Sequence, residues 1–220
     1  MSAMAEPAGA PDWREAAAGP QEAPGPQEAL DILLAGNRRW VSGQSEHPRQ
    51  SPGWRRQLAP HQAPFAVVVS CIDSRVPPEL VFDCGLGDLF VVRTGGQALD
   101  QRVVLGSIQF GPVSYGSARL VLVLGHAGCG AVTAALTVIR GGGQAPGHIQ
   151  AVVDALRPAY HEAMRQSGDL LDNMIRAQTR LTVRRLRGDP LLGEFIATDG
   201  LLIAGGHYDL DSGVVGLITR

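Results

Sequence analysis

Hydrophobic residues gather in five short runs along the chain. Each run is four to six residues long and rich in β-branched side chains, with no alternation of polar positions. This pattern is typical of strands that are buried on both faces. The runs cover residues 65–70, 89–92, 120–124, 201–204 and 214–218.

The segments between these runs carry helical periodicity. They cover residues 77–83, 101–110, 130–140, 148–166 and 169–187. Strands that alternate with helices predict a mainly parallel sheet with crossover helices. The last two runs are joined by a segment too short for a helix, so that pair should be antiparallel. We therefore predict an α/β fold, a mainly parallel four-stranded sheet flanked by helices with an additional antiparallel edge strand.

The N-terminal part of the chain has a different composition. Residues 1–26 are rich in Ala, Pro, Gly and Glu and predict a disordered tail, because such a segment cannot bury enough surface to offset its ordering entropy. Leu30, Leu33 and Trp40 lie at helical spacing and predict an amphipathic helix over 27–42. The expected division is a tail at 1–26, a helix and arm at 27–60, and an α/β domain at 61–220.

Composition and charge exclude several functional classes. The formal net charge is −2 over 220 residues, so no overall field would attract nucleic acid or an anionic membrane. No apolar run approaches the length of about 18 residues that a membrane span needs. The three cysteines form no disulfide framework and favour a reducing compartment. Without a signal-peptide pattern at the N-terminus, we expect a cytoplasmic protein.

Two loops that directly follow predicted strands carry the chemistry. They are Cys71-Ile-Asp-Ser-Arg75 and Gly125-His-Ala-Gly-Cys-Gly130. Such loops meet at the carboxyl edge of a parallel sheet. Cys71, His126 and Cys129 would then offer two sulfurs and one nitrogen, a set that suits Zn²⁺ and leaves one tetrahedral position open. Taken singly, each cysteine could be a core residue and the glycines could form a phosphate loop or a tight turn.

The combined motifs resemble the signature of the β-class carbonic anhydrases. The resemblance covers residues 27–220 and includes the segments 87–94 and 204–213, which are similar to the family's second strand and closing hairpin. It implies one Zn²⁺ per chain and reversible hydration of carbon dioxide to bicarbonate and a proton, by attack of zinc-bound hydroxide. Cys84 lies outside both loops and is expected to be a packed thiol.

The resemblance also assigns roles to individual residues. Asp73 would either pair with Arg75 and orient the attacking hydroxide, or leave Arg75 and become the fourth zinc ligand. These two are the expected catalytic residues, and Cys71, Asp73, His126 and Cys129 are the expected metal ligands. The expected substrate pocket comprises Gln62, Phe90, Gly95, Phe110 and Gly130.

Two pocket positions depart from the family pattern. Phe110 stands where a tyrosine is common, and Gly95 replaces a small apolar side chain, which should loosen the pocket wall. Two alternatives therefore stay open: a hydrolase of carbonyl sulfide or carbon disulfide, and a noncatalytic protein that keeps zinc for structure. The resemblance further implies a homodimer or a dimer of dimers, with residues 27–60 wrapping the partner and no nucleic-acid or membrane partner.

Overall fold

A five-stranded sheet forms the centre of the protein. The computed structural model describes residues 23–99, 102–198 and 200–220. The strand order is β2-β1-β3-β4-β5, in which every neighbouring pair is parallel except β4 and β5. The predicted fold class, with its antiparallel edge strand, is confirmed. The strands are β1 (Ala66–Cys71), β2 (Leu89–Thr94), β3 (Leu120–His126), β4 (Leu202–Tyr208) and β5 (Val215–Thr219).

The helices follow the predicted alternation, with two short additions. Ser51-Pro52 and Asp189-Pro190 begin α2 and α8, and in each the Ser or Asp side chain accepts hydrogen bonds from the first turn. The sequence reading missed both because neither has a long apolar stripe. The helices are α1 (Pro26–Val41), α2 (Pro52–Leu58), α3 (Pro78–Val81), α4 (Arg102–Ser114), α5 (Gly130–Gly141), α6 (Ile149–Ala163), α7 (Leu170–Arg187) and α8 (Pro190–Ala197).

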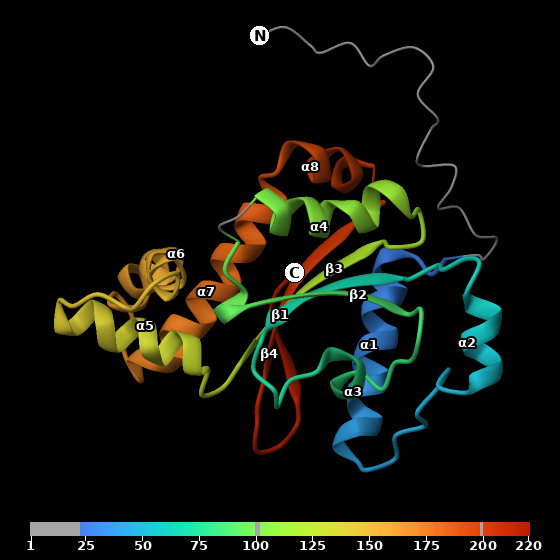
Figure 1. Cartoon of the computed structure of the whole chain (residues 1–220), viewed down its shortest axis with the longest axis horizontal. Helices are drawn as coiled ribbons and strands as arrows, with labels where there is room; N and C mark the ends of the chain where they lie inside the picture. The colour runs from blue at the N-terminus through green and yellow to red at the C-terminus, as the bar shows by residue number, and fades with distance from the viewer. Residues whose placement is uncertain (1–22, 100–101, 199) are drawn as a thin grey trace, which may run out of the picture.

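Both faces of the sheet are covered by helices. Val67 and Val69 of β1 belong to a buried cluster with residues of α4, α8 and the end of α7. Val68, between them, points the other way into a cluster that includes α1 and α3. Figure 1 shows α4 and α8 together on one side of the sheet, with α1 and α3 on the other. Burial on both faces explains why β1 and β3 read as continuous apolar runs.

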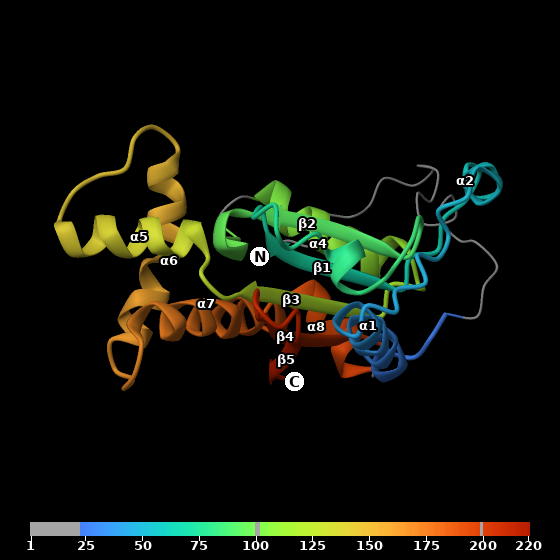
Figure 2. The same ribbon diagram turned by 90° about the horizontal axis from the view of Figure 1, so that it is seen from below.

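The carboxyl edge of the sheet brings the two motif loops together. Ser70 pairs with Leu124 in the parallel register of β1 and β3, so both strands end at the same level. Beyond this edge, α5, α6 and the start of α7 project away from the strands, as Figure 2 shows. Within the described residues, no helix combines the length and apolar character that a membrane span requires.

The N-terminal helix packs against its own chain. Ala29, Leu30 and Leu33 of α1 are fully buried. The buried amide of Asn37 donates to the carbonyls of Val81 and Gly213. By contrast, α2 buries none of its residues, and Trp54 Nε1 donates to the carbonyl of Leu86. The division into three parts stays a prediction, and most of its tail, residues 1–22, lies outside the described residues.

Candidate metal centre

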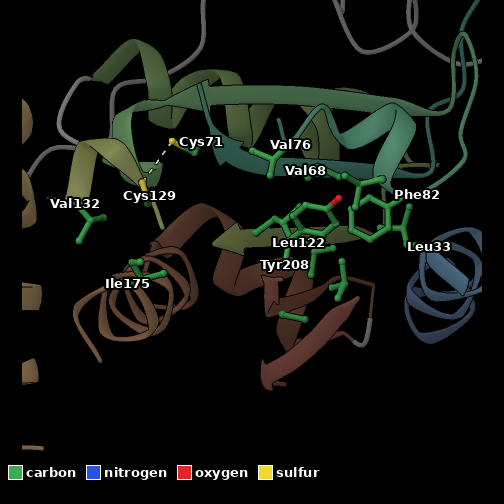
Figure 3. Close-up of a cluster of buried hydrophobic side chains, with 14 of the residues drawn as sticks. Leu33, Val68, Cys71, Val76, Phe82, Leu122, Cys129, Val132, Ile175 and Tyr208 are labelled. Carbon is green, nitrogen blue, oxygen red and sulfur yellow. Dashed lines mark hydrogen bonds between the residues drawn. The ribbon is translucent and has the colours of Figure 1, made fainter. Parts of the chain in front are cut away.

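Three ligand-type side chains converge at the carboxyl edge of the sheet. Cys71 ends β1, His126 ends β3, and Cys129 precedes the first turn of α5. Their donor atoms all lie within 4.8 Å of one another, and all three residues are buried. Figure 3 shows the two sulfurs facing each other, with Val132 and Ile175 on the same side of the cluster. The structure thus brings together the three residues that the two motifs predict as metal ligands.

The orientation of His126 suits metal ligation. Its Nδ1 lies 2.9 Å from the carbonyl oxygen of Ala127, and this contact requires the proton to be on Nδ1. In a neutral imidazole the lone pair of Nε2 is then free, and Nε2 is fully buried with no hydrogen-bond partner. A buried polar atom without a partner is costly, so this nitrogen needs a ligand.

The spacing of the sulfurs fits a zinc ion. Cys71 Sγ and Cys129 Sγ are 3.7 Å apart. Two thiolates on one tetrahedral zinc lie about 3.8 Å apart, because each Zn–S bond is about 2.3 Å long. With the free His126 nitrogen, the set supplies three ligands of the type that zinc prefers. The residues present therefore fit the metal that the resemblance implies.

The two thiols divide one negative charge unequally. The pKa of Cys71 lies well below its usual range, because the Cys129 S–H donates a hydrogen bond to its sulfur, against the opposing effect of burial. The pKa of Cys129 is raised, because it must keep that proton beside the Cys71 thiolate. A second deprotonation requires a positive charge between the sulfurs, which a divalent cation supplies.

Cys84 provides a contrast with these two cysteines. It is free and buried, and burial raises its pKa to about 12. A neutral, buried thiol at this position is a small packing side chain, as the sequence analysis expected.

Asp73 and Arg75 form a two-pronged ion pair beside the cluster. Arg75 Nε and Nη2 donate to the two carboxylate oxygens over 2.9 and 2.7 Å. This pairing lowers the pKa of Asp73. The Asp73 side chain is 13% exposed, and its Oδ2 lies 3.9 Å from His126 Nε2. The structure thus contains the Arg75-paired arrangement, and Asp73 is not among the clustered ligand atoms.

Arg93 is a functional residue that the sequence analysis missed. From β2 its guanidinium donates to the carbonyl oxygens of both Cys71 and Asp73. It therefore fixes the backbone that carries one ligand and the adjacent carboxylate. The sequence places Arg93 in the predicted strand segment 87–94. No motif around it indicates that its side chain reaches the loop that follows β1.

Two of the predicted pocket residues lie beside the cluster. Gly95 directly follows β2, and Gly130 begins α5 immediately after Cys129. A side chain on Gly95 would lie 3.1 Å from Val152 and 3.6 Å from Ala131. Val152 of α6 therefore occupies the space beside Gly95, and the expectation of a loosened pocket wall stays a prediction. A side chain on Gly130 would meet no atom within 4 Å, so the space beside this residue is open.

The other three predicted pocket residues lie elsewhere in the chain. Phe90 pairs with Val67, which precedes Cys71 by four positions, or about 13 Å of strand. Phe90 and Phe110 contact each other and Tyr115, with ring centroids 5.1–6.4 Å apart. Gln62 donates to the Tyr115 hydroxyl over 3.1 Å. These residues gather near the open edge of β2, away from the metal cluster of their own chain.

Comparisons with known proteins identify the family to which this fold and its paired cysteine and histidine loops belong. The family model for carbonic anhydrase matches residues 66–215. Carbonic anhydrase 2 of Mycobacterium tuberculosis is 41% identical over 189 residues, which cover 86% of this chain and 90% of that protein. Carbonic anhydrase of Mycolicibacterium smegmatis is 37% identical, covering 87% of this chain and 93% of that protein.

Solved structures show the same fold. A Coccomyxa β-carbonic anhydrase in complex with acetazolamide superposes with a TM-score of 0.69 at 24% identity, covering 87% of this chain and 86% of that one. A tetrameric β-carbonic anhydrase from Sordaria macrospora gives a TM-score of 0.68 at 21% identity, covering 86% of this chain and 96% of that one. The chain belongs to the β-carbonic anhydrase family and is a carbonic anhydrase.

Proposed function

We propose that this enzyme holds one zinc ion through Cys71, His126 and Cys129 and hydrates carbon dioxide reversibly to bicarbonate and a proton. The observation that carries the proposal is the convergence of two sulfurs and an unpartnered histidine nitrogen within 4.8 Å. Zinc, when bound, lowers the pKa of a coordinated water to about 7, which makes a nucleophile available at neutral pH.

Asp73 and Arg75 supply the orientation in this proposal. An ionised Asp73 can only accept hydrogen bonds, so it can hold a nucleophile's proton and aim the lone pair at the carbon of the substrate. Arg75 keeps the carboxylate ionised and fixes its plane through the two-pronged contact. Arg75 also donates to the carbonyl of Gly128, which links the two motif loops.

Gly95 and Gly130 would form the substrate side of the same pocket. The N–H groups of Ala131 and Val132 face the Cys129 sulfur and lower its pKa. The first turn of α5 therefore favours negative charge, and in this proposal the N–H of Gly130, at the start of the helix, holds a bicarbonate oxygen. The absence of a side chain on Gly130 leaves room for that oxygen.

We further propose a homodimer in which Gln62, Phe90 and Phe110 complete the partner's pocket. Phe90 lies about 13 Å along the strand from its own chain's cluster, and Gln62 and Phe110 gather with it around Tyr115. The face around them includes the open edge of β2 and Val103, whose side chain is 79% exposed. An open edge with large apolar residues favours a second copy over solvent. The other open edge, β5, is available for a dimer of dimers.

A cytoplasmic location agrees with three cysteines that are all free. This location is part of the proposal, together with carbon dioxide and bicarbonate as ligands of the pocket and no nucleic-acid or membrane partner.

Metal analysis combined with a stopped-flow hydration assay tests the proposal. We expect one zinc per chain in the parent protein and loss of both zinc and activity in Cys71→Ser. Cys84→Ser is the matched control, because it also replaces a buried thiol and should keep the metal. Sulfide release from carbonyl sulfide or carbon disulfide, faster than carbon dioxide hydration, would favour the alternative substrates. A parent protein without zinc would contradict the proposal.

A further inference from the structure

A tight turn, Gly95–Gln97, covers the end of β1 beside the metal cluster. Gly96 and Gln97 both have left-handed backbones, with φ angles of 62° and 55°. Glycine adopts this conformation freely, whereas for glutamine it is strained and persists only where the surroundings impose it. The contacts of Gln97 must therefore hold it in place.

Those contacts tie the turn to two other elements. Gln97 is 2% exposed, and its Nε2 donates to the carbonyl of Leu124 over 2.9 Å. Leu124 lies on β3, two residues before His126. The main-chain oxygen of Gln97 accepts a hydrogen bond from the Thr182 hydroxyl of α7 over 3.4 Å. The Gln97 amide thus links this turn directly to β3, the strand that ends in the proposed histidine ligand.

The Gly95–Gln97 turn also contacts Cys71, the proposed ligand on β1. The N–H of Gly96 donates to Cys71 Sγ over 3.5 Å. The hydroxyl of Thr94 donates to the carbonyl of Ala98 and closes the turn at its base. Hydrogen bonds to a ligand atom orient that ligand and tune its affinity for the metal. A shift of the Gly96 backbone would remove this bond.

We propose that Gln97 is a positioning residue for the metal centre. Its buried amide holds the turn against β3, keeps the Gly96 N–H aimed at Cys71 Sγ, and couples the Cys71 half of the site to the His126 half. The inference rests on the zinc site proposed above. A positioning role differs from a packing role in one respect: the affinity for zinc, and not only the stability of the fold, depends on the Gln97 amide.

Three variants separate positioning from packing. Gln97→Met keeps the length of the side chain and removes the amide. Gln97→Gly also removes the amide, and it relieves the backbone strain, so this variant should fold even if the first does not. Gln178→Met is the matched control, because Gln178 is likewise buried and donates to Thr182, one contact further from the metal.

The experiment measures zinc affinity by competition with a chelator, the absorption bands of the cobalt-substituted proteins, and the free energy of unfolding. Both Gln97 variants should bind zinc about 10- to 100-fold more weakly and shift the thiolate-to-cobalt bands. Gln178→Met should lose stability while its zinc affinity and bands stay those of the parent. Parent-like affinity in Gln97→Gly, or equal weakening in Gln178→Met, would overturn the inference. Absence of zinc binding in the parent would instead overturn the proposed site, and the inference with it.

Discussion

The guanidinium of Arg75 meets the carboxylate of Asp73 through two parallel hydrogen bonds of 2.9 and 2.7 Å. The backbone N–H of Arg75 also donates to the same carboxylate. Arg75, which holds Asp73, is therefore only two positions away from it. Both lie on a loop that begins with Cys71, a proposed metal ligand. Ligand and carboxylate are positioned by one short segment, so small changes in this segment should alter catalysis without unfolding the protein.

Replacing Asp73 with Asn should separate catalysis from metal binding. An amide keeps the shape of the side chain but adds a donor and removes the charge, so the nucleophile loses its acceptor. We expect kcat/KM for hydration to fall by about 100-fold or more while zinc content stays at the parent level. Asp154→Asn is the control, since Asp154 pairs with Arg157 on the surface of α6. Retained activity in Asp73→Asn would contradict the proposed role.

Replacing Arg75 with Lys tests the two-pronged contact. Lysine keeps the charge but cannot make two parallel bonds to one carboxylate. Activity should fall by about tenfold, roughly the effect of losing one charge-assisted hydrogen bond.

The same substitution should change the response to acid. Arg75 lowers the pKa of Asp73 in the folded protein, so the pair stabilises the fold above the unfolded carboxyl pKa of about 3.9. This contribution disappears as the pH falls through the lower, folded value. The Arg75→Lys variant should therefore be less stable than the parent at neutral pH. Its free energy of unfolding should also decrease less as the pH falls. Denaturant unfolding at several pH values measures both effects. Identical curves for parent and variant would show that the second bond is dispensable.

A charge on the β2 face should disrupt the proposed dimer. Val103→Glu would place a carboxylate in the interface without a partner, and we expect the dimer to weaken by about 100-fold. Activity per chain should fall with it, because Gln62 and Phe90 would no longer reach a partner's pocket. Analytical ultracentrifugation and the hydration assay measure the two effects. Met164→Glu alters the residue that caps the C-terminus of α6, which is 56% exposed, and should change neither.

His207 should make stability sensitive to mild acid. Its pKa is lowered, first by burial and then by the nearby Arg176, and its Nε2 has no hydrogen-bond partner. As the pH falls below the unfolded histidine pKa of about 6.5, the unfolded chain takes up a proton before the folded protein does. Stability should therefore decrease from about pH 6.5 down to the lower, folded pKa. His207→Gln should flatten this decrease, whereas the exposed His148→Gln should not. A parent curve without any slope in that range would refute the assignment.

The sequence by itself determined the sheet, its parallel order and the three candidate ligands. Runs such as 120–124 are apolar throughout because both faces of the strand are covered by helices. The sequence alone therefore identifies them as buried strands. Cys71 and His126 could be paired because parallel strands end at a common edge, which follows from the direction of the strands alone.

Only the tertiary structure decided which distant side chains meet. Phe90 and Gly95 are only five positions apart. The structure nevertheless places Gly95 beside Val152 and the metal cluster, and Phe90 with Tyr115 near the open sheet edge. The links from Arg93 to Cys71 and from Gln97 to Leu124 likewise join residues that are 22 and 27 positions apart. Local periodicity encodes which face of an element is buried. Contacts between elements depend on how whole side chains pack together, and no short stretch of sequence contains that information.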